Sequence, residues 1–179
     1  MDFQKFVSEH GVPLAKAAGE HLFRQGDEDQ SLYIVRSGLL KAYYLSGDGK
    51  ENIKSFILPG SNIGSLVAIH SKQQCTFSLV CLKDSELIKL DFDSIYQASK
   101  ANLEIAAPMI DFLLAFAMKK ERREYELLCL SAEERYRLLL DNMPDIADRV
   151  TQNELALYLG ITPVGFSRIR KRVRQQSAV

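Results

Sequence analysis

The strongest restriction on the fold comes from two helix-start signals near the end of the chain, separated by a glycine. Thr151 and Glu154 have the spacing of a capping box, in which each side chain bonds the backbone N–H of the other residue. Gly160 suits the left-handed residue that follows a helix. Thr162 suits a new N-cap, and Pro163 suits the first helical position, where no N–H is needed. This segment therefore predicts two short helices joined by a three-residue turn.

The apolar spacing of the same segment predicts how the two helices pack. Ala156 is small where the helices would cross, and five larger residues are spaced to fill the contact: Leu155, Leu159, Ile161, Phe166 and Ile169. This pattern is typical of a helix-turn-helix, whose second helix enters the major groove of DNA. The alternative is an αα-hairpin with a charged solvent face.

The charge distribution favours DNA binding over the hairpin. The formal net charge of the chain is zero, but residues 151–179 hold five arginines and lysines against Glu154 alone, a net charge of +4. Residues 1–150 therefore carry −4. Four of the cations fall within residues 168–172, and we expect them to face no acid. Such a basic end predicts contact with an anionic partner, here double-stranded DNA.

The N-terminal half has a different pattern. From Leu22 to about Leu90 the sequence consists of short alternating runs rich in β-branched and aromatic residues. The runs are separated by turn residues, namely Gly38, Gly47, Asp48, Gly49 and Gly60. We expect hairpins in a small antiparallel barrel or sandwich.

Helical patterns begin after Asp91. The stretch DFDSIYQASKAN predicts one short helix, and NLEIAAPMIDFLLAFAMKKERREYELL predicts a much longer one that Pro108 permits only in its first turn or at a kink. The long helix has one apolar face formed by Ile105, Met109, Phe112 and Phe116. This face can pair with a second copy, which we favour, or pack back on the same chain.

Two further segments connect the long helix to the basic end. Ser131 opens another capping box, S-A-E-E, so a helix should begin there and end before Pro144. The stretch PDIADRV that follows is expected to be a linker.

Composition excludes several classes of protein. The chain of 179 residues has 46% hydrophobic residues and no run long enough for a membrane span, and its first residues do not resemble a secretory signal, so a cytoplasmic location is expected. Its three cysteines, Cys75, Cys81 and Cys129, contain no CxxC pair. Its three histidines are scattered. We expect no metal site, no cofactor and no enzyme activity, since the signatures of phosphate loops and of catalytic nucleophiles are missing.

The whole chain resembles the Crp/Fnr family of bacterial transcription regulators. The resemblance rests on LYIVRSGLLKAYYLSGDGKENIKSFILPGSNIGSL and on NELALYLGITPVGFSRIRK. It implies an α+β protein with a cyclic-nucleotide-binding-like jelly-roll barrel over residues 1–101, a dimerisation helix over 102–129 and a helix-turn-helix domain over 131–179. The order SAEERY followed by YLGITPVGFSRIRKR resembles a subgroup that lacks the β-hairpin wing of most relatives.

The resemblance also suggests how DNA is read. Where cyclic AMP-responsive relatives place Arg and Glu, this chain has Pro163 and Val164, whereas Arg168 falls on a matching basic position. We expect Arg168 to read a guanine and Val164 to contact a thymine methyl group. The full set of expected DNA contacts, including phosphate contacts by the remaining cations, is Thr151, Gln152, Thr162, Pro163, Val164, Gly165, Ser167, Arg168, Arg170, Lys171 and Arg172.

The effector pocket departs from the family pattern. The family uses Glu to hold the ribose and Arg to neutralise the cyclic phosphate, and the corresponding residues here are Ser65 and Cys75. A buried phosphate without a cation is costly, so cyclic AMP should bind weakly or not at all. The pocket residues, which could line a cavity for another ligand or for none, are Gly64, Ser65, Leu66, Cys75 and Thr76. The N-terminal cysteine cluster of iron–sulfur members is missing from this sequence, which disfavours redox sensing.

The leading hypothesis is a homodimeric, sequence-specific DNA-binding regulator with RNA polymerase as a further partner and no membrane association. The alternative is a cyclic-nucleotide-type ligand-binding module that signals through protein partners. The basic end favours the regulator, because a protein-docking surface would more often mix charges or expose apolar residues.

Overall fold

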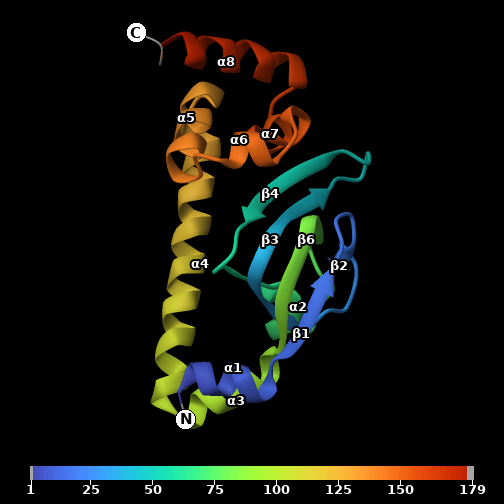
Figure 1. Cartoon of the computed structure of the whole chain (residues 1–179), viewed down its shortest axis with the longest axis vertical. Helices are drawn as coiled ribbons and strands as arrows, with labels where there is room; N and C mark the ends of the chain where they lie inside the picture. Colours follow the sequence, from blue (N-terminus) through green and yellow to red (C-terminus); the bar gives the residue numbers. More distant parts are fainter. Residues whose placement is uncertain (1, 177–179) are drawn as a thin grey trace. The chain divides into compact units, whose positions relative to one another are not determined.

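The computed structural model describes residues 2–176 (Figure 1). Contacts divide the chain into two compact units. The first contains the residues up to Lys50 together with Lys54–Phe116, and the second contains Glu51–Ile53 and the residues from Ala117 onward. The predicted boundaries of the three segments stay a prediction. Within residues 2–176, no helix combines the length and the apolar character that a membrane span requires.

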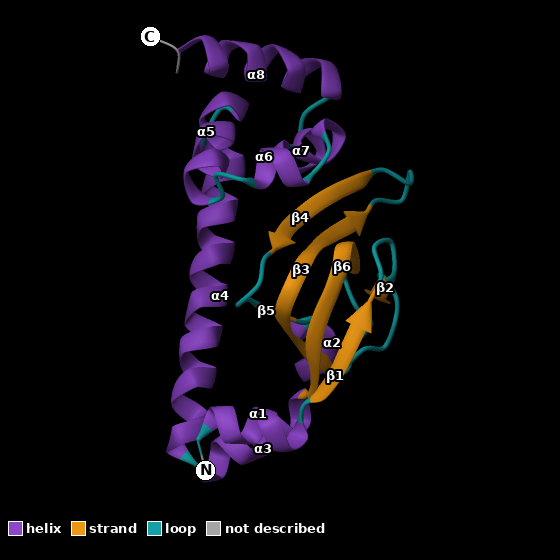
Figure 2. Cartoon of the chain, in the orientation of Figure 1, coloured by secondary structure: helices purple, strands orange, loops and turns teal. Residues whose placement is uncertain are grey.

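The first unit combines a sheet with short helices (Figure 2). Its elements are α1 (Phe3–His10), β1 (Val12–Lys16), β2 (His21–Phe23), β3 (Ser31–Leu45), β4 (Glu51–Ile57, of which this unit contains the part from Lys54), β5 (Asn62–Ile63), α2 (Leu66–Ser71), β6 (Ser78–Asp91) and α3 (Phe92–Ala101). The strand order is β1-β6-β3-β4, with β2 paired to β6 and β5 paired to β3. Strands β1 and β3 both run antiparallel to β6, and Leu32 lies opposite Leu90. An antiparallel sheet in a mixed α and β protein was predicted and is confirmed. Closure into a barrel stays a prediction, because the pairing among residues 2–176 is an open path.

Strands β3 and β6 are longer than predicted. We expected a break at Gly38, but Gly38 lies inside β3, where the register with β6 shifts. Its φ of +97° is in the left-handed region, and a Cβ there would lie 2.6 Å from the carbonyl oxygen of Asp84. Glycine therefore bends this long strand instead of ending it. The alternating pattern also predicts two separate runs, TFSLVCLKDS and ELIKLDF, but both contribute to one strand, β6. The breaks expected at Gly49 and Gly60 are confirmed as turns.

Buried side chains, mostly from the strands, form a hydrophobic cluster. The ring of Phe23 packs against Phe77 and Tyr33, with centroids 5.2 and 6.2 Å away. These rings belong to a buried cluster that also includes Leu79, Cys75 and Cys81.

A second cluster lies beneath α1, α3 and the start of the long helix α4 (Leu103–Cys129). Ile105 and Met109 are buried in it, with 1% and 5% of their surface exposed, against side chains such as Phe6 and Ile95. The prediction that Ile105 and Met109 form the dimer face is therefore wrong, because both side chains are buried in the core of their own chain. Phe112 also packs against this cluster. Pro108 lies inside α4, beyond the first turn.

The second unit is helical. It contains the end of α4 and four further helices: α5 (Ala132–Asn142), α6 (Ile146–Arg149), α7 (Gln152–Leu159) and α8 (Pro163–Gln176). The capping box at Ser131 is confirmed, with Glu134 N donating to Ser131 Oγ at 3.3 Å. The expected linker after Pro144 instead contains α6, which buries Ile146.

Candidate nucleic-acid interface

Local hydrogen bonds fix the start of α7 and the turn between α7 and α8. The N–H of Glu154 donates to Thr151 Oγ1 at 3.2 Å, and the N–H of Thr151 donates to the Glu154 carboxylate at 2.9 Å. Gly160 has a φ of +68°, which glycine adopts without strain. The N–H of Gly165 donates to Thr162 Oγ1 at 3.1 Å and so caps α8. The predicted pair of helices and their three-residue turn are confirmed.

Buried side chains join the two helices. Leu155, Ala156 and Leu159 of α7 are buried, as are Phe166 and Ile169 of α8. Ala156 is fully buried, which allows the close approach that its small size predicted. Of the predicted contact residues, only Ile161 stays half-buried. Because this packing uses one side of α8, the opposite side is left for a partner.

The predicted DNA-contact residues lie on α7, at its N-cap Thr151, on α8 or in the turn between the two helices. Nine of the eleven are exposed, whereas Gly165 and Arg170 are half-buried. Val164 is 65% exposed although it is apolar. At helical spacing, Val164, Arg168 and Lys171 follow one another along the same exposed face of α8.

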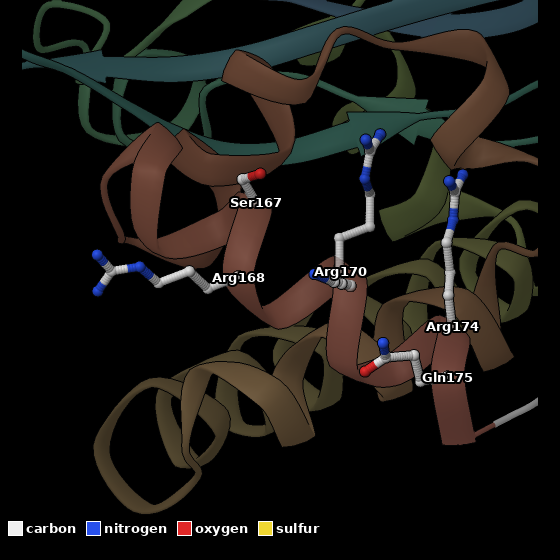
Figure 3. Close-up of a pocket in the computed structure, with 6 residues that line it drawn as sticks. Ser167, Arg168, Arg170, Arg174 and Gln175 are labelled. Carbon is white, nitrogen blue, oxygen red and sulfur yellow. The ribbon is translucent and has the colours of Figure 1, made fainter.

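An open groove runs along α8 beside this face (Figure 3). The residues that line it are Ser167, Arg168, Arg170, Lys171, Arg174 and Gln175. Figure 3 shows Arg170 and Arg174 extending in the same direction, while Arg168 extends to a different side. Sequence reasoning missed Arg174 and Gln175. The spacing would have found them, since Arg174 is four residues after Arg170 and Gln175 is four after Lys171.

Two of the cations have partners within the chain. Arg172 Nε lies 3.2 Å from a carboxylate oxygen of Glu133 on α5, so the expectation that these cations face no acid is wrong for Arg172. With its amide oxygen turned toward Arg170, Gln152 accepts a hydrogen bond from Nη1 of that residue at 2.8 Å. Because the side chain of Arg172 is 61% exposed, its ion pair is weak.

The expected effector residues lie in the first unit and are mostly buried. Ser65 and Cys75 are 1% and 2% exposed, and Thr76 is exposed. Burial raises the pKa of the Cys75 thiol. A Cβ on Gly64 would lie 2.8 Å from the carbonyl oxygen of Ser31. Gly64 is therefore packed tightly, and the lysine of this segment, Lys72, is paired with the Asp93 carboxylate, 2.7 Å from its Nζ.

Comparison with known proteins gives matches over both units. The family described as cyclic nucleotide-binding domain matches residues 14–102. The transcriptional activator protein Anr of Pseudomonas protegens is 28% identical over 195 residues, which cover 100% of this chain and 76% of that protein. The fumarate and nitrate reduction regulatory protein of Yersinia pestis is 29% identical, over 96% of this chain and 71% of its own length. The structure of FixK2 from Bradyrhizobium japonicum superimposes with a TM-score of 0.81 and 19% identity, covering 93% of this chain and 86% of FixK2.

Proposed function

The chain is a DNA-binding transcription regulator of the Crp/Fnr family, and we propose that it acts as a homodimer whose two α8 helices enter successive major grooves of a two-fold related site. One observation carries the proposal. Helix α8 is anchored by Phe166 and Ile169, and this leaves the face of Val164, Arg168 and Lys171 exposed. A recognition helix has this construction, with an apolar side in the protein and a polar side in the groove.

The exposed face suggests a role for each residue. Arg168 can donate two hydrogen bonds to a guanine, and Val164, one turn earlier, can contact a thymine methyl group. Lys171, Arg170 and Arg172 are assigned to phosphates, with Arg170 released from Gln152 and Arg172 from Glu133 when DNA binds. Thr151 and Gln152 begin α7 and would meet the DNA backbone from the first helix. We add Arg174 to the phosphate contacts because it extends in the same direction as Arg170 (Figure 3).

The proposed dimer uses a different face of α4 from the one predicted. The side chains of Ile110 and Leu114 are 56% and 57% exposed, one turn apart, on the side away from the buried Ile105 and Met109. Leu103, Met118 and Leu128 extend the same stripe with 85%, 60% and 77% of their surface exposed. A stripe of large apolar side chains along one helix is the pattern by which two helices pair. RNA polymerase is the proposed further partner of the DNA-bound dimer.

We propose that the sheet domain does not bind cyclic AMP. Ser65 and Cys75 supply no positive charge to pair with the cyclic phosphate. The rings of Phe23, Tyr33 and Phe77 belong to the buried cluster of the sheet domain. This proposal holds whether or not the strands close into a full jelly-roll barrel. Isothermal titration of the purified protein with cyclic AMP should give no binding heat, and micromolar affinity would refute it.

A salt titration tests the DNA-binding face. The probe is a fluorescent duplex selected by the wild-type protein from a random pool. Arg168→Ala should weaken binding by about 1–3 kcal/mol and relax the base preference at one position of each half-site. Lys171→Ala should weaken binding to all duplexes alike and lower the slope of log Kd against log salt by about 1. Arg122→Ala, an exposed charge change on α4, is the matched control. If Arg168→Ala behaves like this control, the assignment of α8 as the reading helix is wrong.

A further inference from the structure

The carbonyl groups at the end of α7 have unusual partners. The last four carbonyls of any helix have no partner within it and must find one elsewhere. In α7 the backbone supplies two of them, since the N–H of Ile161 donates to Ala156 O at 3.0 Å and the N–H of Gly160 donates to Leu157 O at 3.3 Å. The remaining two carbonyls, those of Tyr158 and Leu159, accept hydrogen bonds from arginines of other helices.

The first of these arginines is Arg123, near the end of α4. Its Nη2 donates to Tyr158 O, and the centre of its guanidinium lies 4.0 Å from the centroid of the Tyr158 ring. Nη1 of the same side chain lies 3.5 Å from the carboxylate of Glu126, one turn further along α4. Glu126 is itself buried, with 9% of its surface exposed. A planar guanidinium can stack on a ring and donate at its edge at the same time, whereas a lysine ammonium cannot.

The second arginine is Arg135, in the first turns of α5. Its Nη2 donates to Leu159 O at 2.9 Å, while its Nη1 donates to Leu130 O at 2.6 Å. One guanidinium therefore joins the corner between α4 and α5 to the last residue of α7. The positive charge of both arginines also lies at the negative end of the α7 dipole.

We propose that Arg123, Glu126 and Arg135 form a clamp that fixes the carboxyl end of α7 on α4 and thereby sets the position of the recognition helix α8. Glu126 offsets the repulsion between the two arginines, and neither arginine is among the proposed DNA contacts. For its effect on operator binding the inference rests on the proposed function, because α4 carries the proposed dimer contact and α8 the DNA contact. In such a dimer the clamp determines the distance between the two α8 helices.

Hydrogen exchange of the free protein tests the clamp without DNA. Arg123→Lys and Arg135→Lys keep the charge but lose the forked donor geometry. Amide exchange in α7 and in the turn at Ile161 should become about tenfold faster, the effect of one charge-assisted hydrogen bond, while exchange in β3 and β6 stays unchanged. Arg122→Lys is the control on the same helix. Unchanged exchange in α7 relative to this control would overturn the proposal.

Half-site spacing tests the effect on DNA binding. Wild-type protein is titrated with its selected duplex and with the same duplex lengthened by one base pair between the half-sites. The clamp variants should lose a large part of the wild-type preference for the shorter duplex. A variant that is only less stable would weaken binding to both duplexes equally and keep their ratio, which would overturn the positioning role.

The two proposals can fail separately. If wild-type protein does not distinguish the two duplexes, the dimeric binding mode fails, and hydrogen exchange still decides the clamp. If Arg123→Gln or Arg135→Gln, each of which removes the positive charge, lowers the salt slope by about 1, that arginine contacts a phosphate directly and is not a positioning residue.

Discussion

The ring of Tyr136 in α5 meets the ring of Phe166 in α8 edge-on, with centroids 5.1 Å apart and an angle of 88° between the planes. Both side chains are buried. Phe166→Ala should therefore destabilise the helical unit by about 3–5 kcal/mol, since it removes a large buried ring and leaves a cavity. Urea unfolding followed by circular dichroism measures the change. Tyr136→Phe keeps both rings and is the control. An unchanged midpoint for Phe166→Ala would mean that α8 is not anchored through this contact.

The three cysteines should differ sharply in reactivity. Cys75 and Cys81 are buried, whereas Cys129 is exposed. Burial raises the pKa of both buried thiols, so little of the reactive thiolate forms at neutral pH. A disulfide reagent such as Ellman's should titrate one thiol per chain in native protein and three in denaturant. Cys129→Ser should abolish the native reaction. Fast reaction at Cys75 would instead reopen a redox-sensing role for the sheet domain.

An acidic residue in the exposed stripe of α4 should separate the dimer. Leu114→Asp places a charge where the proposed partner helix packs, and burying an unpaired carboxylate is strongly unfavourable. Sedimentation velocity should show a monomer, with operator affinity reduced at least about tenfold because two half-sites are no longer bound together. The control Ala115→Asp introduces the same carboxylate one position away, at an exposed site off the stripe. If both variants remain dimers, the dimer contact lies elsewhere.

Alkaline unfolding should depend on Tyr33. Burial raises the pKa of its phenol well above the ordinary value, and the nearby Asp29, which accepts its hydrogen bond at 2.9 Å, raises it further. Above about pH 10 the unfolded chain loses this proton while the folded chain keeps it. The free energy of unfolding therefore falls as the pH rises through that range and is unaffected by this group at lower pH.

The comparison of wild type with Tyr33→Phe isolates that effect. The variant keeps the buried ring but has no proton to lose, so its stability should fall less steeply with pH above about 10. Urea midpoints measured in parallel from neutral to alkaline pH check the difference. The buried thiols titrate in both proteins and cancel in the comparison. Parallel curves would show that the phenol ionises as easily in the folded chain as in the unfolded one.

Local signals predicted the helices and caps at the end of the chain well. The capping boxes at Ser131 and Thr151 and the left-handed Gly160 depend on residues within a few positions of one another, so the sequence alone specifies their hydrogen bonds. The same reasoning identified Thr162 as the cap of α8. What it predicted least well was the length of β3, because a glycine at a strand bend and a glycine at a strand end look alike in a sequence.

Features that depend on packing between distant segments were not predicted. Helix α4 has apolar residues on two faces, and periodicity does not say which one the chain covers itself, so Ile105 and Met109 were assigned to the wrong contact. The partners of Arg172 and of Arg135 belong to other helices, and no local sequence pattern indicates them. The four residues of α6 are too few for a periodic signal.

The hydrogen bonds of Arg123 and Arg135 to α7 end on main-chain oxygens, which every amino acid provides. Apart from the ring of Tyr158, these hydrogen bonds make no demand on which side chains α7 carries. The exposed face of α8 can therefore change its sequence without loss of this attachment, provided that the buried anchors Phe166 and Ile169 are kept. A regulator built in this way can acquire new target sites while its attachment geometry stays the same.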